Sequence, residues 1–399
     1  MHEYWFMSGI ANPKRTRRPQ GVPRFSRLSG KLRAPPAGTR YGFSDAKRGV
    51  NPMRTLSKFA APAVAILAVS GQASAQSMTP GMKRVIDALK ATRPAPVPQL
   101  TYDQAREQAG PADAYMAVLA MEGKPSTDPD VKAMHVAMPG PSGKPLILKL
   151  FRPKQAGAAK LPTVVYYHGG GWVIAGTRGY QASCEAIAKL GNCNVVEVAY
   201  RMAPEAKFPA AHEDSYAALQ YVAKNPAKFM AVPGKISVLG ESAGGNLATA
   251  VCMMAKDRRG FMPKAQVLIY PVTQEGMVTP SYRKYQKAVP LSTPMLSWFY
   301  NYEFGNPKGL PGNKLASPLN APLSALRGLP PATFVHAEID PLLSEGKMYH
   351  DKLKKAGVTT AGKTWMGVTH EFFGMGMVVP EAMEAEQYAV AALKKSWGM

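Results

Sequence analysis

The chain has 399 residues, of which 46% are hydrophobic, and its formal net charge is +23. This length and apolar content suffice for one α/β domain with an attached cap. Residues 1–75 carry 13 Lys and Arg against two acids, so they contribute +11 and leave +12 for the rest. That remaining charge is not concentrated like the basic patch of a nucleic-acid binder, and no nucleic-acid motif occurs.

Residues 1–52 are rich in Arg, Pro, Gly and Ser and lack any apolar period. Such a composition cannot bury enough surface to offset chain entropy, so we expect this segment to be disordered. Residues 53–75 then combine a basic start, an apolar run over 59–69 and an Ala-Ser-Ala cleavage site at 73–75. This layout is typical of a secretory signal peptide and predicts an exported protein, periplasmic or secreted.

A signal peptide normally begins at the N-terminus, whereas this one begins at residue 53. We therefore hypothesise that Met53 is the true start and that 1–52 is untranslated upstream sequence. The alternative is a genuine basic extension. A mature N-terminus at Gln76 in mass spectra of the native protein supports export, and peptides from 1–52 would refute the internal start. After cleavage no membrane-spanning segment remains, so no stable membrane insertion is expected.

Beyond residue 76, apolar strands alternate with helical patterns, which predicts a mostly parallel, doubly wound α/β sheet. The hairpin strands are 131–138 and 145–153, and the later strands are 163–167, 194–200, 235–240, 265–271, 331–340 and 359–366. Helices are predicted at 178–190, late in 200–225, at 342–356 and at 380–396. Two segments do not follow this alternation of strands and helices: residues 78–126, which contain helical patterns, and residues 275–325, which are irregular. We predict that both form a helical cap.

Gly240-Glu241-Ser242-Ala243-Gly244 fits G-x-S-x-G between a strand and an Ala-rich helix. A serine on such a sharp turn takes a strained conformation and projects its hydroxyl clear of the sheet. The flanking glycines let strand and helix approach closely. The pentapeptide alone fits an ordinary strand-to-helix turn equally well. The rest of the chain therefore has to supply an oxyanion hole, an acid and a base.

His168-Gly169-Gly170-Gly171-Trp172 follows the strand that begins at 163. Successive glycines let the backbone approach a ligand and turn its N–H groups inward. Two of these N–H groups, with that of the residue after the serine, would bind the oxyanion of a tetrahedral intermediate. The motif is much more specific than a bare glycine run, because it lies between a strand and a helix and upstream of the serine.

Asp340 ends a later strand, and His370 follows the last one. Glu338 and Glu345 are competing acids, but neither lies at the strand end. Of the seven histidines, His370 alone follows Asp340 at such a position. The order Ser242, Asp340, His370 is that of an α/β-hydrolase triad, in which the base takes the serine proton and the acid fixes its tautomer.

HGGGW, YRMAPE with FPAA, GESAGGN, DPL and THEF together resemble the hormone-sensitive-lipase-like family of bacterial carboxylesterases, over most of residues 80–397. The resemblance implies an α/β-hydrolase fold with a helical cap that acts on short- to medium-chain acyl esters. It places the oxyanion donors at Gly170, Gly171 and Ala243. His168, Gly169, Trp172 and Glu241 have supporting positions. The charged pair in YRMAPE, Arg201 and Glu205, is expected to hold a loop near the site.

Three positions depart from the family's pattern. Glu241 stands where Asp or Thr is usual before the serine. The usual D-P-L-R-D-E becomes D-P-L-L-S-E, with Leu343 and Ser344. The usual H-G-F becomes H-E-F, so Glu371 puts a carboxylate beside the base, where it can alter the imidazole pKa or the charge of the pocket. None of these changes removes a triad member.

We therefore expect a serine carboxylesterase that works through an acyl-enzyme without a cofactor or a metal ion. A lactonase, amidase or acyltransferase on the same triad is an alternative, and a non-catalytic ligand-binding protein is a second. The expected partner is a small-molecule ester, and the protein is expected to be a monomer or homodimer. Three cysteines give no disulfide framework. Cys184 and Cys193 could pair after export, although buried free thiols are favoured.

Overall fold

The computed structural model describes residues 77–399 except 275 and 307. The disorder predicted for 1–52 and the signal peptide predicted for 53–75 lie outside the described residues. Within the described part, no helix combines the length and the apolar character needed to cross a membrane.

The core is one sheet of eight strands in the order β1-β2-β4-β3-β5-β6-β7-β8. The strands are β1 (Val131–Pro139), β2 (Pro145–Pro153), β3 (Leu161–Tyr167), β4 (Asn194–Val198), β5 (Ala231–Glu241), β6 (Gln266–Ile269), β7 (Ala332–Ile339) and β8 (Thr360–Thr369). β1 and β2 form the predicted antiparallel hairpin, β2 pairs antiparallel with β4, and all other neighbours are parallel. Every residue of β3, β4, β6 and β7 is buried, as expected for parallel strands covered on both faces. The predicted α/β-hydrolase fold class is confirmed.

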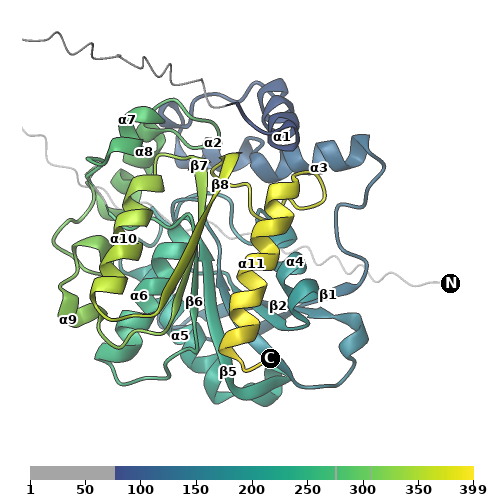
Figure 1. Cartoon of the computed structure of the whole chain (residues 1–399), viewed down its shortest axis with the longest axis vertical. Coiled ribbons are helices and arrows are strands. Elements are labelled where there is room, and N and C mark those ends of the chain that lie inside the picture. Colours follow the sequence, from purple (N-terminus) through teal and green to yellow (C-terminus); the bar gives the residue numbers. More distant parts are fainter. Residues whose placement is uncertain (1–76, 275, 307) are drawn as a thin grey trace, which may run out of the picture. The chain divides into compact units, whose positions relative to one another are not determined.

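Helices cover both faces of the sheet (Figure 1). One face packs against α5 (Ala210–Lys224), α6 (Ala243–Asp257) and α10 (Leu343–Lys355). The other packs against α4 (Gln181–Gly191) and α11 (Pro380–Ser396), together with α1 (Pro80–Ala91) and α3 (Pro111–Met121). The core therefore consists of two apolar clusters with the sheet between them.

Four further helices remain in the described part of the chain: α2 (Tyr102–Glu107), α7 (Pro280–Lys284), α8 (Thr293–Phe304) and α9 (Leu323–Leu326). Three of them, α2, α7 and α8, lie near the end of the sheet to which β7 and β8 point, and α9 is a single short turn (Figure 1). Short 3₁₀ turns occur at Val97–Gln99, Lys154–Ala156, Pro226–Phe229 and Pro318–Asn320. Segment 275–325 is therefore more helical than its sequence indicated.

The capping residues explain why two of these helices form. Ser292 accepts a hydrogen bond from the Met295 amide at the start of α8, and Gly305 ends that helix with φ 68°. Thr101 and Gln104 form a capping box at the start of α2. The run TPMLSWFYNYEF of α8 has almost no apolar period, so the periodicity that reveals other helices is missing here.

The strand predicted at 163–167 ends at Tyr167 as expected, and the glycine-rich residues after it form a loop. The last strand continues past 366 to Thr369 and carries the chain directly to His370. Its pairing with β7 is irregular between Ala337 and Ile339, opposite the point where Gly367 has φ 68°. Such an irregularity lets the strand continue through a glycine that otherwise suggests an end.

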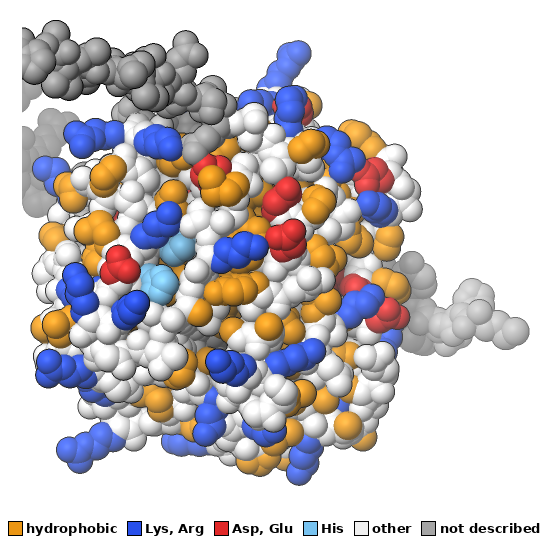
Figure 2. All heavy atoms as spheres, viewed as in Figure 1, with side chains coloured by type: hydrophobic (Ala, Val, Ile, Leu, Met, Phe, Trp, Pro, Cys, Tyr) orange, Lys and Arg blue, Asp and Glu red, His pale blue; other side chains and the backbone are white. Residues whose placement is uncertain are grey.

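Basic side chains are spread over the visible face of the molecule. Figure 2 shows Lys and Arg scattered among apolar and acidic side chains on that face, with no continuous basic stripe. On this face the excess charge is therefore not concentrated in one patch.

Candidate active site

Ser242 lies on the turn between β5, which ends at Glu241, and α6, which begins at Ala243. Its backbone has φ 56° and ψ −116°, a strained conformation for a residue with a Cβ. A Cβ at Gly240 would overlap the carbonyl of Gly244, and one at Gly244 would overlap the carbonyl of Tyr167. Both glycines of G-x-S-x-G are therefore required by the close approach of strand, helix and neighbouring strand.

The structure brings Ser242, Asp340 and His370 together from the ends of three strands. The Nδ1 atom of His370 lies 2.7 Å from Oδ2 of Asp340, and its Nε2 atom lies 2.9 Å from Oγ of Ser242. A carboxylate can only accept, so Nδ1–H donates to Asp340 and Nε2 is left to accept from the serine hydroxyl. The three side chains are 0–5% exposed.

The two competing acids have other partners. Glu338 accepts a hydrogen bond from the Gly367 amide at 2.7 Å. Glu345 accepts from the amide of Thr273 at 2.6 Å and from the hydroxyl of Tyr282 at 2.5 Å. Each therefore anchors a loop, and Asp340 is the carboxylate that contacts Nδ1 of His370.

The surroundings of His370 raise the pKa of its imidazole above that of an ordinary histidine. Burial alone would lower the pKa of the imidazole, but the charge and hydrogen bond of Asp340 raise it, with smaller contributions from Glu371 and Glu241. The net result is a pKa above the ordinary value. The ring of Tyr270, 4.4 Å away between centroids, packs against the imidazole.

The loop after β3 presents its glycine backbone to the serine. Gly170 and Gly171 have φ 88° and 59°, and both line the same cavity as Ser242. A Cβ at Gly171 would overlap the ring of Phe299. Ala243 is the first residue of α6, so its N–H is one of the four at a helix start that have no intrahelical acceptor. Helix N-termini also favour negative charge.

The supporting residues His168 and Trp172 are buried under this loop. Burial lowers the pKa of His168 to about 4, so the ring is neutral at pH 7. Its Nδ1–H donates to the carbonyl of Gly169 at 2.9 Å, and the ring stacks on Tyr200 with centroids 4.1 Å apart. Trp172 has φ 62°, and its carbonyl accepts the amide of Ala203 at 2.9 Å. The His168 side chain and the Trp172 backbone therefore stabilise the loop.

Glu241, also predicted as supporting, is fully buried beneath the serine turn. The hydroxyls of Tyr166 and Tyr270 both donate to its carboxylate. Burial and then the charge of Glu371 raise the pKa of Glu241 to about 7, although the two tyrosines oppose the shift. Because Tyr270 also packs on His370, Glu241 fixes the position of a ring that contacts the His370 imidazole. The sequence analysis missed Tyr270, whose position directly after strand β6 was the available signal.

Arg201 and Glu205, the two charged residues expected to hold a loop near the site, each bind a different partner. Arg201 binds Asp214 instead, with Nε–Oδ2 and Nη2–Oδ1 distances of 2.8 Å. Glu205 binds Arg106 of α2 at 2.6 and 2.9 Å. Arg106 also donates to the carbonyl of Val173 at 2.7 Å, so it ties α2 to the glycine loop. Arg106 could not be considered as the partner of Glu205 from the sequence, because α2 was not predicted.

A cavity of about 690 Å³ opens onto Ser242 and His370. This volume is in the range of small-molecule sites. Both segments predicted as cap line it. The first contributes Leu89, Pro94, Val97, Arg106 and Met116, among others, and the second contributes Lys287, Leu291, Ser292, Met295 and Phe299, among others.

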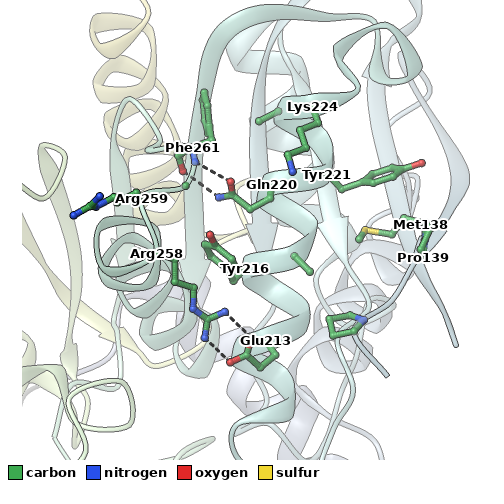
Figure 3. Close-up of a pocket in the computed structure, with 14 residues that line it drawn as sticks. Met138, Pro139, Glu213, Tyr216, Gln220, Tyr221, Lys224, Arg258, Arg259 and Phe261 are labelled. Atoms are coloured by element: carbon green, nitrogen blue, oxygen red, sulfur yellow. Dashed lines mark hydrogen bonds and ion pairs between the residues drawn. The ribbon is translucent and has the colours of Figure 1, made fainter. Parts of the chain in front are cut away.

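A second hollow of about 730 Å³ lies over α5 and the segment after α6 (Figure 3). Several of its polar groups are already paired: Glu213 binds Arg258 at 2.7 Å, and the Gln220 side chain bonds both backbone groups of Phe261 at 2.8 and 3.2 Å. None of Ser242, Asp340 and His370 lines it. It therefore has no arrangement for nucleophilic catalysis, and the first cavity is the candidate site.

Cys184, Cys193 and Cys252 are all buried free thiols, so the possible disulfide between the first two is not formed. Within residues 77–399, leaving out 275 and 307, no cluster of three or more His, Cys, Asp or Glu side chains is arranged to hold a metal ion.

Comparisons with known proteins agree with this geometry. The profile of the Abhydrolase_3 family, described as an alpha/beta hydrolase fold, matches residues 164–374. Ethyl acetate hydrolase of Pseudomonas putida is 31% identical over 331 residues, 80% of this chain and 99% of the relative. Carboxylesterase NlhH of Mycobacterium tuberculosis is 37% identical over 241 residues, 59% of this chain and 74% of the relative. The structure of a hyperthermophilic esterase from the archaeon Pyrobaculum calidifontis has a TM-score of 0.72 and 35% identity, covering 80% of this chain and 98% of that one.

Proposed function

Because the chain belongs to the hormone-sensitive-lipase-like family of alpha/beta hydrolases and is a serine carboxylic ester hydrolase, we propose that Ser242, Asp340 and His370 carry its catalysis. We further propose that its substrates are esters of short- to medium-chain acids. The observation that carries the first proposal is the chain of contacts from Asp340 through His370 to Ser242, at 2.7 and 2.9 Å, with Ser242 and His370 lining the cavity.

In the proposed mechanism, Oγ of Ser242 attacks the ester carbonyl while its proton passes to Nε2 of His370. The N–H groups of Gly170, Gly171 and Ala243 stabilise the oxyanion of the tetrahedral intermediate. His370 then gives its proton to the leaving alcohol, and an acyl-enzyme remains. A water molecule repeats the sequence with His370 as base, which releases the acid and restores the serine hydroxyl. Asp340 holds the imidazole in the required tautomer throughout.

Lactonase, amidase and acyltransferase activities use the same triad and stay as alternatives to simple ester hydrolysis. The experiment that separates them is a panel of p-nitrophenyl esters with acyl chains of two to sixteen carbons, matched amides and lactones, with product analysis. We expect the highest kcat/KM for esters of two to eight carbons. A higher kcat/KM for lactones, amides or esters above twelve carbons would contradict the proposal.

The proposed chain-length preference is supported by Phe299 of α8. Its ring lies against Gly171, where a Cβ would overlap it, and it lines the cavity with Leu291 and Met295. The side chain is 3% exposed, so it fills space that a longer acyl chain needs.

Phe299→Ala should shift the preference toward longer acyl chains. We expect the ratio of kcat/KM for p-nitrophenyl decanoate to that for the acetate to rise about tenfold, since room for even one methylene group changes discrimination by that order. Phe261→Ala, which removes an aromatic ring from the second hollow (Figure 3), is the matched control and should leave the ratio unchanged. An unchanged ratio in Phe299→Ala would show that this ring does not limit the acyl chain.

A further inference from the structure

Glu371 has a backbone conformation that is usually adopted by glycine. Its φ is 67°, in the left-handed region that side chains with a Cβ rarely adopt. The residue follows His370 directly, and its side chain, 20% exposed, lines the cavity beside Ser242. Strained conformations of this kind persist where the surrounding structure holds them, and they are concentrated at functional sites.

Contacts fix the Glu371 carboxylate at one edge of the imidazole. Its Oε1 atom lies 3.7 Å from Nε2 of His370, and the hydroxyl of Tyr180 donates to the same oxygen at 2.8 Å. Tyr180 is itself buried, with its hydroxyl so close to Gly169 that a Cβ there would overlap it. The carboxylate therefore lies at the Nε2 edge, whereas Asp340 contacts the Nδ1 edge.

Several groups from neighbouring strands affect the protonation of His370 and Glu371. Asp340 follows β7, Glu241 ends β5, and Tyr270 follows β6 and covers the ring. Burial raises the pKa of Glu371 above its ordinary value, and the charge of His370 and the hydrogen bond from Tyr180 offset only part of this rise. The remaining charged side chains that line the cavity are Arg106, Glu107, Asp113, Arg178 and Lys287.

We propose that Glu371 is a positioning residue that acts through His370, a role that rests on the triad proposed above. When Ser242 transfers its proton to Nε2, the imidazole becomes a cation with a carboxylate at each edge, Asp340 at Nδ1 and Glu371 at Nε2. Glu371 takes no proton in this step. Its charge stabilises the imidazolium, and its oxygen lies on the side of the ring from which Nε2–H must reach the leaving oxygen.

This role has a defined consequence for the pH dependence of kcat/KM. His370 acts as a base only when it is neutral in the free enzyme, so activity rises with pH through its pKa. A negative charge within about 4–6 Å raises the pKa of a cationic group by about 1–3 units. Removing the charge of Glu371 should therefore lower this pKa and move the acid limb of the profile to lower pH.

The test compares Glu371→Gln and Glu371→Gly with the unaltered enzyme. The glutamine keeps the size of the side chain, and the glycine suits the positive φ, so at least one variant should fold, as checked by circular dichroism. Glu384→Gln is the control, because it removes an exposed carboxylate of α11 that pairs with Lys363. The measurement is kcat/KM for p-nitrophenyl butyrate from pH 4.5 to 9 at constant ionic strength.

We expect both Glu371 variants to shift the acid limb down by about one pH unit and to lower the plateau by up to about tenfold, since one pKa unit is a tenfold change in proton affinity. Glu384→Gln should coincide with the unaltered enzyme. Acid limbs of the folded Glu371 variants that coincide with it, or that move up, would overturn the proposal. If Ser242→Ala is inactive in that case, only the role of Glu371 fails; turnover by Ser242→Ala would instead refute the triad.

Discussion

Replacement of Ser242 by alanine is expected to lower kcat for p-nitrophenyl butyrate by about 10⁶-fold. The substitution removes the nucleophilic oxygen, which lies 2.9 Å from Nε2 of His370, so no acyl-enzyme can form. The glycine loop and the start of α6 still stabilise an oxyanion, and the residual activity should reflect that contribution alone. Substrate binding should change little, because the hydroxyl is a small part of the cavity surface.

A matched control lies on the same strand. Ser237 of β5 is also buried, but its hydroxyl contacts Ser396 and the indole N–H of Trp397 at 3.1 and 3.0 Å, away from the cavity. Ser237→Ala should therefore retain its kcat even if its stability falls. Turnover by Ser242→Ala close to that of the unaltered enzyme would mean that another group is the nucleophile.

The second large effect is expected for Asp340→Asn, which should lower kcat by about 10⁴-fold. The carboxylate accepts Nδ1–H of His370 at 2.7 Å and thereby leaves Nε2 free of a proton. An asparagine NH₂ group at this place donates to Nδ1 and moves the proton to Nε2, so the imidazole can no longer accept from Ser242. The side-chain volume is almost unchanged, so the loss should appear in kcat and not in folding.

The control variants for this prediction are the competing acid Glu338 and an exposed aspartate. Asp351→Asn, on the surface of α10, should leave kcat unchanged. Glu338→Gln changes the partner of the Gly367 amide and should affect stability more than kcat. If Glu338→Gln abolished turnover while Asp340→Asn retained it, the acid of the triad would have been assigned to the wrong residue.

The positions of the site residues were predictable because each follows a predicted strand, and the strands before Ser242 and Asp340 are visible as apolar runs. In a mostly parallel sheet these strand ends meet at one edge, so Ser242, Asp340 and His370 were expected to lie together. The glycine loop was predictable for the same reason, since His168 begins it directly after β3.

The remaining features depend on contacts between distant segments. The carboxylate of Glu241 is understood only once Tyr166 and Tyr270, from two other strand ends, are placed around it. The partner of Glu205 required knowledge of α2, a six-residue helix specified by its capping box and not by an apolar period. Phe299 belongs to a helix with apolar residues on every side, so no pattern indicated that it would face the glycine loop.

The central claim is that Ser242 is the nucleophile that becomes acylated, and labelling with a fluorophosphonate tests it most directly. Intact-mass and peptide mass spectrometry should show one adduct per chain, on Ser242, formed at the rate at which esterase activity is lost. Ser242→Ala should give no adduct, and Ser237→Ala should label normally. An active enzyme that gives no adduct, or an adduct on another residue whose formation tracks the loss of activity, would contradict this account.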